Sequence, residues 1–407
     1  MATAARTGTA SLTPAPRLTP SPTSTSGATP TTTMQPSAAP PASPTATPSC
    51  PPPRTYVVKP GDTLTVIASR HGVTVRGLLA ANPQIIDPNL VRTGERIIIS
   101  PIDLGTVGHL SGVSAINDRG QIVGATDSSG AARPFLWQDG MMTNLGTLGG
   151  DGDSWANDIN EHGQIVGTAE IAGGSRRAFL WQDGIMTDLG TLPGDDWSSA
   201  SAINDNGVIV GVSGSTSAHR QHAFLWQNGT MTSLGLLGWD GDLWASDIND
   251  SGQVVGGAGY GSSGQWYGIL WQDRTTADLR VLAGDGRSGA AAINDRGQVV
   301  GASGGQAVLW HDDTMADLRV LPGDDTNSAS AINDRGQVVG TSYSKPARTG
   351  ADPDVVVGRP FLWKDGTLTD LGTLAGQESS GAADINTCGQ IIGHSGGHLV
   401  LWQVPVE

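Results

Sequence analysis

Residues 201–211 read Ser201-Ala202-Ile203-Asn204-Asp205-Asn206-Gly207-Val208-Ile209-Val210-Gly211, and this stretch occurs seven times along the chain with small variations. Its asparagine falls at Asn117, Asn160, Asn204, Asn249, Asn294, Asn333 and Asn386. A Leu-Trp pair recurs as often, with its tryptophan at Trp137, Trp181, Trp226, Trp271, Trp310, Trp363 and Trp402. Self-similarity at a period of about forty residues indicates a repeat architecture in which each repeat is one small structural unit.

The spacing of these landmarks predicts the structure of each repeat. A third landmark, Asp-Leu-Gly or a variant, follows each of the first six tryptophans by nine residues, and a Val-Gly or Ile-Gly pair closes seven residues after every asparagine. These constant segments carry turn sequences of the Asn-Asp-x-Gly and Gln-Asp-Gly type, in which Asp and Gly tolerate the positive φ of tight hairpins. The apolar runs between the turns are too short for helices. Each repeat is therefore predicted to be a four-stranded antiparallel meander, and the seven together a β-propeller in a mainly β protein.

The two ends of the repeat region predict a closed ring. The region opens with Asp103-Leu104-Gly105, which belongs to the end of a repeat, and its last repeat has only three strands, ending at Trp402. The opening strand is expected to complete the seventh blade, as in WD-repeat propellers, because an open array would leave strand edges exposed.

Composition and charge exclude several classes of protein. The 407 residues contain no run of eighteen apolar residues, so no membrane span is expected. The formal net charge is −15, and because residues 1–100 are slightly basic the repeat region carries about −20. Such a surface repels phosphate backbones, which excludes nucleic acid as a partner. The two cysteines, Cys50 and Cys388, do not form a metal-binding pair and are interpreted as independent thiols.

Residues 1–53 are rich in Pro, Thr, Ser and Ala and contain no acidic residue. Such a segment cannot bury enough apolar surface to offset its ordering entropy, so we expect a disordered tail or linker. It lacks the apolar stretch of a secretory signal, which leaves the export route open. A spacer through a cell wall and an ordinary disordered tail are both compatible with this composition.

Residues 54–100 have a different pattern. Tyr56-Val57-Val58 predicts a strand, Asp62 is placed to cap a helix through Ala68, a second helix is expected over 75–81, and 94–99 predict a closing strand. This β-α-α-β unit resembles a LysM domain. The motif Tyr-x-Val-x-x-Gly-Asp-Thr-Leu is matched at 56–64, Asn-Pro at 82–83 and Gly-x-x-Ile-x-Ile at 94–99, so the resemblance covers the whole 47-residue segment.

The resemblance implies binding of glycans that contain N-acetylglucosamine, such as peptidoglycan or chitin, in a shallow groove between the first loop and the loop before the last strand. By position the groove would use Gly61, Asp62, Thr63, Leu64, Pro83, Gln84, Ile85 and Ile86. Backbone amides around a glycine suit acetamide groups, and apolar side chains suit sugar faces. Structural roles are the alternative, since Asp62 is also a candidate helix cap and Leu64 a candidate core residue.

Residues 101–407 resemble the HAF-repeat proteins, which are extracellular bacterial proteins with an Ala-Phe-Leu-Trp and Asp-Leu-Gly-Thr-Leu signature, matched here at 178–181 and 188–192. The resemblance implies an extracellular context but no activity, and a propeller fold does not name a function. The segment between the Val-Gly and Leu-Trp landmarks is the one that varies in length. Recognition is therefore expected on the face that carries the second turns and the blade connections.

The twelve tryptophans fall into two groups. The seven of the Leu-Trp pairs are expected to lie in the core. The other five are expected in blade connections and one second turn of consecutive blades, on the variable face: Trp155, Trp197, Trp239, Trp244 and Trp266. With the aspartates nearby they would form an aromatic patch suited to a sugar or a peptide; packing of the rings between blades is the alternative.

Catalytic and metal-binding motifs are weak. Glutamate is scarce and forms no evident acid–base pair. Gly-x-Ser-x-Gly occurs at 301–305 and 393–397, but no helix is expected to follow, so the strand–turn–helix nucleophile elbow is missing. The histidine pairs at 219 and 222 and at 394 and 398 lack a third metal ligand. The Asp-Gly-Asp runs at 151–153 and 240–242 lack the full ligand string of a calcium loop, and plain turns are expected there.

The sequence thus predicts a non-catalytic binding protein of the cell surface or extracellular space, with no cofactor and no resident metal. A tail (1–53) precedes a glycan-binding LysM domain (54–100) and a seven-bladed propeller (101–407) that serves as a recognition platform for a protein or sugar ligand. The alternative is a divergent cell-wall or polysaccharide hydrolase, or the accessory subunit of one.

Overall fold

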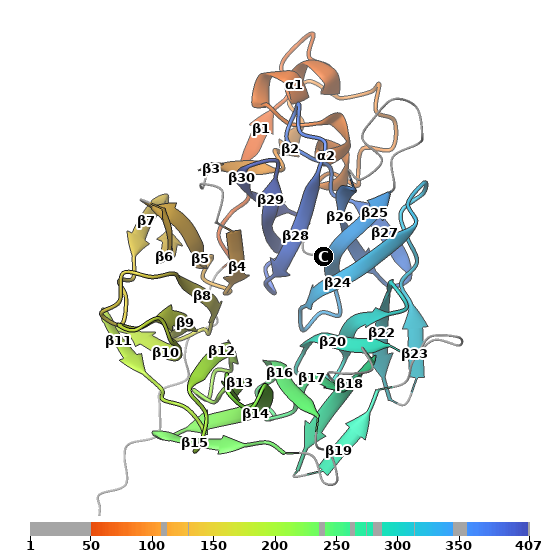
Figure 1. Ribbon diagram of the computed structural model, residues 1–407. Helices are drawn as coiled ribbons and strands as arrows, with labels where there is room; N and C mark the ends of the chain where they lie inside the picture. The colour runs from red at the N-terminus through yellow and green to blue at the C-terminus, as the bar shows by residue number, and fades with distance from the viewer. Residues whose placement is uncertain are drawn as a thin grey trace, which may run out of the picture. The chain divides into compact units, whose positions relative to one another are not determined.

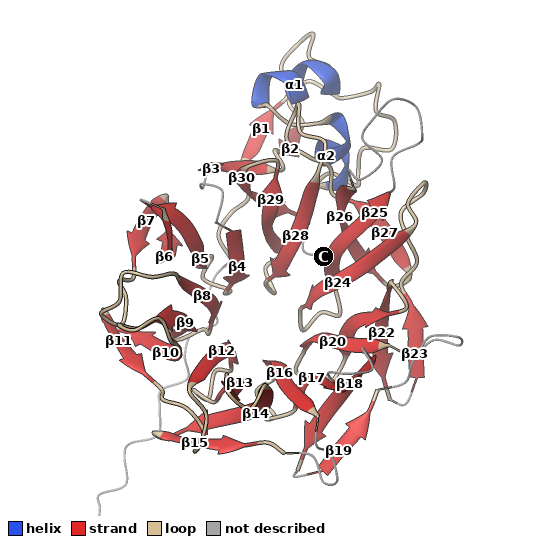
Figure 2. Ribbon diagram, in the orientation of Figure 1, coloured by secondary structure: helices blue, strands red, loops and turns tan. Residues whose placement is uncertain are grey.

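The protein is described here by a computed structural model that covers residues 50–106, 112–128, 130–235, 241–260, 265–273, 275–279, 287–312, 314–344 and 356–405. The predicted tail therefore lies outside the described residues up to residue 49. Within the described residues nearly all regular structure is strand, and the two helices both belong to the segment before the repeats (Figure 2). The prediction of a mainly β protein with a small α+β unit at its N-terminal side is confirmed.

The repeats form seven antiparallel sheets of four strands each (Figure 1). Blade 1 contains β4 (Gly112–Ile116), β5 (Ile122–Ser128), β6 (Ala131–Gln138) and β7 (Met141–Asn144). Blade 2 contains β8 (Ser154–Ile159), β9 (Ile165–Glu170), β10 (Arg176–Gln182) and β11 (Ile185–Asp188). Blade 3 contains β12 (Trp197–Ile203), β13 (Ile209–Ser215), β14 (Arg220–Gln227) and β15 (Thr230–Ser233). Blade 4 contains β16 (Asp242–Ile248), β17 (Val254–Tyr260), β18 (Gln265–Gln272) and β19 (Thr275–Asp278).

The remaining three blades follow the same order. Blade 5 contains β20 (Ser288–Ile293), β21 (Val299–Ser303), β22 (Gln306–His311) and β23 (Thr314–Asp317). Blade 6 contains β24 (Thr326–Ile332), β25 (Val338–Ser344), β26 (Val357–Lys364) and β27 (Thr367–Asp370). Blade 7 contains β28 (Ser380–Ile385), β29 (Gln390–Ser395), β30 (His398–Gln403) and, from the start of the repeat region, β3 (Ile102–Thr106).

The ring is closed by the first strand of the repeat region, as predicted. β3 pairs antiparallel with β30, with Ile102 opposite Leu401 and Thr106 opposite His398. The first and last strands of the repeats therefore share one sheet, and neither is left as an unpaired end. The seven sheets are arranged around a common axis (Figure 1), with β4, β8, β12, β16, β20, β24 and β28 innermost.

The turns have the chemistry that the sequence predicts. Between β10 and β11, Asp183 and Gly184 have φ of 52° and 83°, which is the left-handed backbone of a type I′ hairpin. In the turn after the innermost strand of blade 3, Gly207 has φ 72° and its amide donates to the carbonyl of Asn204 at 3.0 Å. Tight turns at fixed positions hold the four strands of each blade in register.

The core of the blades is formed by aliphatic residues and by aromatic rings from the third strand. Phe135, Phe179, Phe224 and Phe361, each two residues before a Leu-Trp tryptophan, are at most 1% exposed. Burying such a side chain contributes about 1.5–3 kcal/mol. The expectation that the Leu-Trp tryptophans lie in the core is confirmed for Trp271, Trp310 and Trp402, whereas the other four are only partly buried. In the four blades with phenylalanine at this position, the phenylalanine is fully buried and the Leu-Trp tryptophan only partly.

The unit before the repeats has the predicted β-α-α-β order: β1 (Thr55–Val57), α1 (Leu64–His71), α2 (Val75–Ala80) and β2 (Arg96–Ile98). β1 and β2 pair antiparallel, with Tyr56 opposite Ile97. The prediction that Asp62 caps α1 is wrong, because Thr63 is the N-cap and its Oγ1 accepts the amide N–H of Val66 at 3.2 Å. Gly72, with φ 69°, ends the helix in a left-handed conformation.

This unit packs on the propeller, and the two belong to one compact unit, residues 48–407. Val73 and Leu374 form an antiparallel bridge, and the amide of Ala375 donates to the carbonyl of Gly72 at 3.0 Å. The approach is close at Gly77, where an added Cβ would lie 2.9 Å from both the Pro101 ring and the Ser100 carbonyl. Glycine is required at this point because a side chain would overlap the segment that enters β3.

The two cysteines form a disulfide, Cys50–Cys388, across 338 residues of sequence. The interpretation as independent thiols is therefore wrong. Cys388 lies in the first turn of blade 7, and Cys50 lies in the segment that precedes β1. The disulfide ties both ends of the described chain together at the same blade.

Candidate functional site

The predicted glycan groove consists of two loops anchored on the β1–β2 sheet. In the second loop, Asn82 is fully buried, its side-chain amide donates to the carbonyl of Ile98 at 2.8 Å, and its Oδ1 accepts the Ile98 amide at 2.8 Å. In the first loop, the Asp62 carboxylate accepts the hydroxyl of Tyr56 at 2.7 Å and the amide of Lys59 at 2.9 Å. Both loops are thereby fixed before any ligand binds.

Six of the eight predicted groove residues have side chains or backbone at the surface. Gly61, Thr63, Pro83, Gln84 and Ile86 are exposed and Asp62 is half-buried; Ile86 is the most exposed at 95%. Leu64 and Ile85 are 1% and 8% exposed and belong to the core of the unit. Leu64 and Ile85 can meet a ligand only through their backbone, and the Asp62 side chain is itself only 6% exposed. The side chains of Thr63, Pro83, Gln84 and Ile86 and the backbone at Gly61 stay a predicted binding surface.

Charge in the first loop is held by a small network. Arg70 donates to the Tyr56 hydroxyl at 2.7 Å and pairs with the Asp62 carboxylate at 3.3 Å. The Tyr56 hydroxyl bond, followed by the Lys59 amide, lowers the pKa of Asp62 below its ordinary value, and the same bond raises the pKa of Tyr56. Asp62 is therefore ionised at neutral pH and orders the loop that would meet the glycan.

The repeat asparagines form a hydrogen-bonded ring around the propeller axis. The side-chain amide of Asn160 donates to the carbonyl of Asn204 at 3.0 Å, and the same bond links every blade to the next, including Asn386 to Asn117 at 3.0 Å. The Oδ1 of each asparagine accepts an amide of its own turn, as in the bond from Val208 to Asn204 at 2.9 Å. One residue type thus closes the turn within each blade and joins neighbouring blades.

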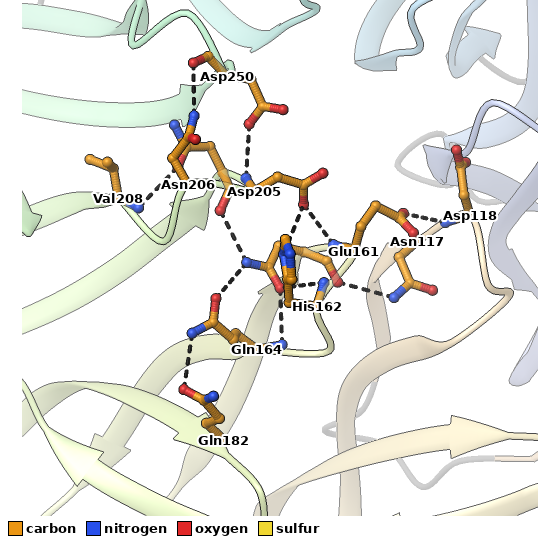
Figure 3. Close-up of polar contacts among 12 residues, drawn as sticks. Asn117, Asp118, Glu161, His162, Gln164, Gln182, Asp205, Asn206, Val208 and Asp250 are labelled. Carbon is orange, nitrogen blue, oxygen red and sulfur yellow. Dashed lines mark hydrogen bonds and ion pairs between the residues drawn. The ribbon is translucent and has the colours of Figure 1, made fainter. Parts of the chain in front are cut away.

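A second ring lies one residue further along each turn. Asp118, Glu161, Asp205, Asp250, Asp295 and Asp334 carry its carboxyl groups, and Thr387 occupies the seventh position. The amide of Asp205 donates to the Asp250 carboxylate at 2.8 Å, and the amide of Glu161 donates to Asp205 at 2.8 Å (Figure 3). The two rings and the preceding isoleucines line an axial cavity of about 280 Å³. Desolvation raises the pKa of Glu161, Asp250 and Asp334.

Three further carboxyl groups lie deeper on the innermost strands. Asp158, Asp247 and Asp384 each bond the amide of the next residue and an amide of the following blade, as Asp158 does with Ile203 at 2.8 Å. Desolvation raises the pKa of Asp158 and Asp247 to about 7 and that of Asp384 to about 6. These three carboxyl groups, named here the inter-blade carboxyls, join neighbouring blades by hydrogen bonds and change charge near neutral pH.

Two of the five additional tryptophans come together in a cleft between blades 2 and 3. Trp155 lies in β8 and Trp197 begins β12, so both are in strands and not, as predicted, in blade connections. They line a cleft of about 490 Å³ with Asn157, Arg176, Ser199 and Gln221, named here the tryptophan cleft. Because Trp155 is the second residue of β8 and Asn160 follows the end of that strand, the cleft opens at the opposite end of the blades from the asparagine ring.

Trp244 and Trp266 do not line this cleft. Trp244 lies in β16 and packs on Gly257, where an added Cβ would be 2.2 Å from the indole. Trp266 lies in β18, is 43% exposed and carries the Arg287 guanidinium 4.8 Å from its ring centre. Trp239 lies outside the described residues. Of the four tryptophans in this group that the structure describes, two line the cleft, one packs within its own blade and one lies at the surface.

The serines of the weak catalytic motifs are buried in strands, and one histidine of each weak metal-binding pair contacts an aspartate. Ser303 and Ser395 of the Gly-x-Ser-x-Gly stretches are buried in β21 and β29, and Ser395 Oγ accepts the amide of Leu374 at 3.1 Å. His222 contacts Asp195 at 3.1 Å and His398 contacts Asp103 at 3.1 Å. The described residues contain no cluster of three or more His, Cys, Asp or Glu side chains arranged to hold a metal ion. The same part of the chain contains no helix long and apolar enough to cross a bilayer.

Sequence reasoning missed the inter-blade role of the asparagines and the polar residues of the tryptophan cleft. The signal for the first was present, since the asparagine recurs at a fixed register in all seven repeats. For Arg176 and Asn157 there was no signal, because they are not repeated and meet only when two blades stand side by side.

Comparison with known proteins assigns the N-terminal unit. Residues 56–100 match the family model of the LysM domain. The endolysin of Bacillus phage PZA is 51% identical over 45 residues, and the N-acetylmuramoyl-L-alanine amidase XlyA of Bacillus subtilis (strain 168) is 57% identical over 47 residues. These matches span 11% and 12% of this chain and only 17% and 16% of the relatives. The chain therefore contains a LysM domain, and its likeness to these proteins is confined to that segment.

The propeller resembles solved structures in fold alone. An oligogalacturonate lyase from Vibrio parahaemolyticus superimposes with a TM-score of 0.50 at 10% sequence identity, over 77% of this chain and 94% of that one. Identity this low carries no information on substrate.

Proposed function

We propose that this chain is a non-catalytic binding protein that attaches to peptidoglycan, or another glycan containing N-acetylglucosamine, through its LysM domain and presents a HAF-type propeller as a recognition platform. In this proposal residues 54–100 form the glycan-binding domain and 101–407 the propeller, and the protein acts outside the cell or in the cell wall. The observation that carries the proposal is the LysM match over 56–100.

The chemistry of the LysM surface supports a glycan ligand. Gly61 has φ 85° and is exposed, so its turn can offer backbone amides to acetamide groups. Pro83 and Ile86 are exposed apolar groups that suit a sugar face. The domain is slightly basic and the propeller carries about −20, so an anionic cell wall would favour contact through the LysM side of the molecule.

The names of the two relatives support a cell-wall target. One is an endolysin and the other an N-acetylmuramoyl-L-alanine amidase, and both share with this chain the LysM segment. We transfer binding from that segment and not cleavage, because the shared stretch is a sixth of their length. The burial of Ser303 and Ser395 argues against the hydrolase alternative based on those serines.

Sedimentation of the full chain with purified peptidoglycan and with chitin tests the proposal. Point variants suit this test better than deletion of the domain, which would also remove the contacts at Val73 and Gly77. Ile86→Asp removes an exposed apolar contact and adds a negative charge, and we expect at least a tenfold loss of affinity, equivalent to about 1.4 kcal/mol. Ile185→Asp is the matched control, since Ile185 is also exposed, at 67%, but lies in blade 2.

Wild-type sedimentation together with retention in Ile185→Asp and loss in Ile86→Asp supports the proposal. Failure of the wild type to bind either polymer refutes attachment through the LysM domain. Equal binding by Ile86→Asp and the wild type refutes the assigned groove.

A further inference from the structure

The tryptophan cleft differs in charge from the rest of the propeller. Thr168 and Val212 complete its lining, so among the residues that the structure describes Arg176 is the only charged side chain in the cleft, and none of the described lining residues is a carboxylate. This occurs in a domain whose net charge is about −20. A cleft that excludes carboxylates on such a surface is matched to a ligand that brings its own negative charge.

Arg176 is held in place without a carboxylate partner in the cleft. Its guanidinium lies 5.3 Å from the ring centre of Trp155, a cation–π contact that fixes the group at the rim. Glu170 is opposite Arg176 in the β9–β10 pair, but its carboxylate packs against Gly152, where an added Cβ would lie 2.2 Å from it. The exposed Arg176 side chain is thus available to a bidentate anion.

The remaining lining favours a saccharide over a peptide. Two half-buried indoles offer flat apolar faces, and around them stand amide and hydroxyl groups of Asn157, Ser199 and Gln221. Val212 is the one aliphatic residue of the lining, so a peptide's aliphatic side chain would find little to pack against. A pyranose presents an apolar C–H face and a rim of hydroxyls, which corresponds to this arrangement. The volume of about 490 Å³ is within the range of small-ligand sites.

The walls of the cleft are preorganised. The indole of Trp197 lies against Gly214, where an added Cβ would be 2.5 Å from the ring, so it cannot move toward that strand. The side-chain amide of Asn157 donates to the Ala200 carbonyl at 2.6 Å, which joins blade 2 to blade 3 across the cleft. Fixed walls reduce the entropy lost on binding.

We propose that the tryptophan cleft binds a pyranose that bears a carboxylate, with the sugar ring on the Trp155 and Trp197 indoles and the carboxylate on Arg176. This inference rests on the proposed recognition role of the propeller and names its ligand class. A uronic acid and a muramic acid share this chemistry, and they differ in whether the carboxylate is attached to the ring carbon or to a lactyl ether.

Titration calorimetry of the full chain carrying Ile86→Asp, which weakens the LysM groove, tests the inference. The ligands are trigalacturonic acid, its methyl ester, the disaccharide of N-acetylglucosamine and N-acetylmuramic acid, and neutral chitotriose. We expect at least one of the two acids to bind, and the methyl ester or chitotriose to bind at least tenfold more weakly. Which acid binds identifies the source of the carboxylate.

Arg176→Gln should lose at least tenfold in affinity for the acid and should no longer distinguish the acid from a neutral saccharide. Arg287→Gln is the matched control, because Arg287 also stacks on a tryptophan, Trp266, outside the cleft. Trp197→Ala should weaken acid and ester alike. The inference is overturned if neither acid binds at millimolar concentration, if the methyl ester binds as well as the acid, or if Arg176→Gln binds normally.

These outcomes can be separated from the proposed attachment to peptidoglycan. That attachment is read from sedimentation of the chain with an intact LysM groove. A chain that sediments with peptidoglycan but binds neither acid in the cleft retains the proposed attachment and loses only this inference.

Discussion

The asparagine ring gives a quantitative prediction about what holds the propeller closed. Asn249 is 4% exposed; its side-chain amide donates to Gln253 Oε1 at 2.7 Å and to the Asn294 carbonyl at 3.0 Å, and its Oδ1 accepts the Gln253 amide at 2.9 Å. Asn249→Asp preserves shape and the acceptor but removes both donors. Each lost bond costs about 0.5–1.5 kcal/mol, and a buried carbonyl left unpaired costs about 1–3 kcal/mol. We expect a loss of about 2–4 kcal/mol in the free energy of unfolding.

The repeats themselves supply graded controls. At Asn204 the side-chain amide donates to the Asn249 carbonyl at 3.0 Å. Val208 occupies the position that corresponds to Gln253 in the next blade, and its side chain cannot accept a second hydrogen bond. Asn204→Asp therefore removes one donated bond, and the loss in free energy of unfolding should be about half that of Asn249→Asp. Asn228→Asp should change the free energy by less than about 0.5 kcal/mol, because Asp139 and Asp183 occupy the same turn position in other blades.

Guanidinium unfolding at pH 8, followed by tryptophan fluorescence, measures these differences. The reasoning is refuted if Asn249→Asp is within 0.5 kcal/mol, roughly the size of a neutral surface change, of the wild type. A loss in Asn204→Asp equal to or above that of Asn249→Asp would also refute it.

Three further predictions concern the inter-blade carboxyl group of Asp247, the disulfide and the contact between the N-terminal unit and the propeller at Gly77. Burial raises the pKa of Asp247 to about 7, above its ordinary value of 3.8, so the folded state loses stability as pH rises from about 4 to about 7, by up to about 1.4 kcal/mol per pH unit. In Asp247→Ala the melting temperature should therefore fall less over that pH range than in the wild type. The same dependence of melting temperature on pH in both proteins would contradict the assignment. Cys388→Ser opens a loop of 338 residues and should lower the free energy of unfolding by up to about 5 kcal/mol, and Cys50→Ser should lower it equally. The double variant should be no less stable than either single variant, as measured by unfolding without reductant. Additive losses would contradict a shared disulfide. Gly77→Ala should lower the free energy of unfolding by about 1–3 kcal/mol, because the added Cβ would overlap Pro101. Gly289→Ala is the control and should cause no such loss, because a Cβ added there meets nothing within 4 Å. Equal melting temperatures for the two variants would exclude a tight contact at Gly77.

Much of the fold could be predicted because the repeats carry local information many times over. The turn at Asn204 and Gly207 is specified by residues three positions apart, and its recurrence indicated the number of blades. The LysM unit was recognisable for the same reason, since its motif residues stabilise turns and helix ends within one short segment. Even there a local ambiguity remained: Asp62 and Thr63 are adjacent, both can cap a helix, and only Thr63 does so.

Contacts between residues of different blades, or between the N-terminal unit and the propeller, could not be predicted. The amide of Asn160 bonds a carbonyl 44 residues away, and Cys50 meets a cysteine 338 residues away. Neither contact is encoded in a local pattern, because each joins residues that come together only in the folded chain. The tryptophan cleft belongs to the same class, since Trp155 and Trp197 come from different repeats and meet because their blades are neighbours.

Hydrogen exchange of the full chain with and without a soluble N-acetylglucosamine oligomer tests the proposed attachment most directly. The account predicts slower amide exchange over residues 61–64 and 83–86 when the oligomer is present, with the propeller strands β4 to β30 unchanged. Slowing confined to the propeller, or no slowing at a saturating concentration, would contradict it.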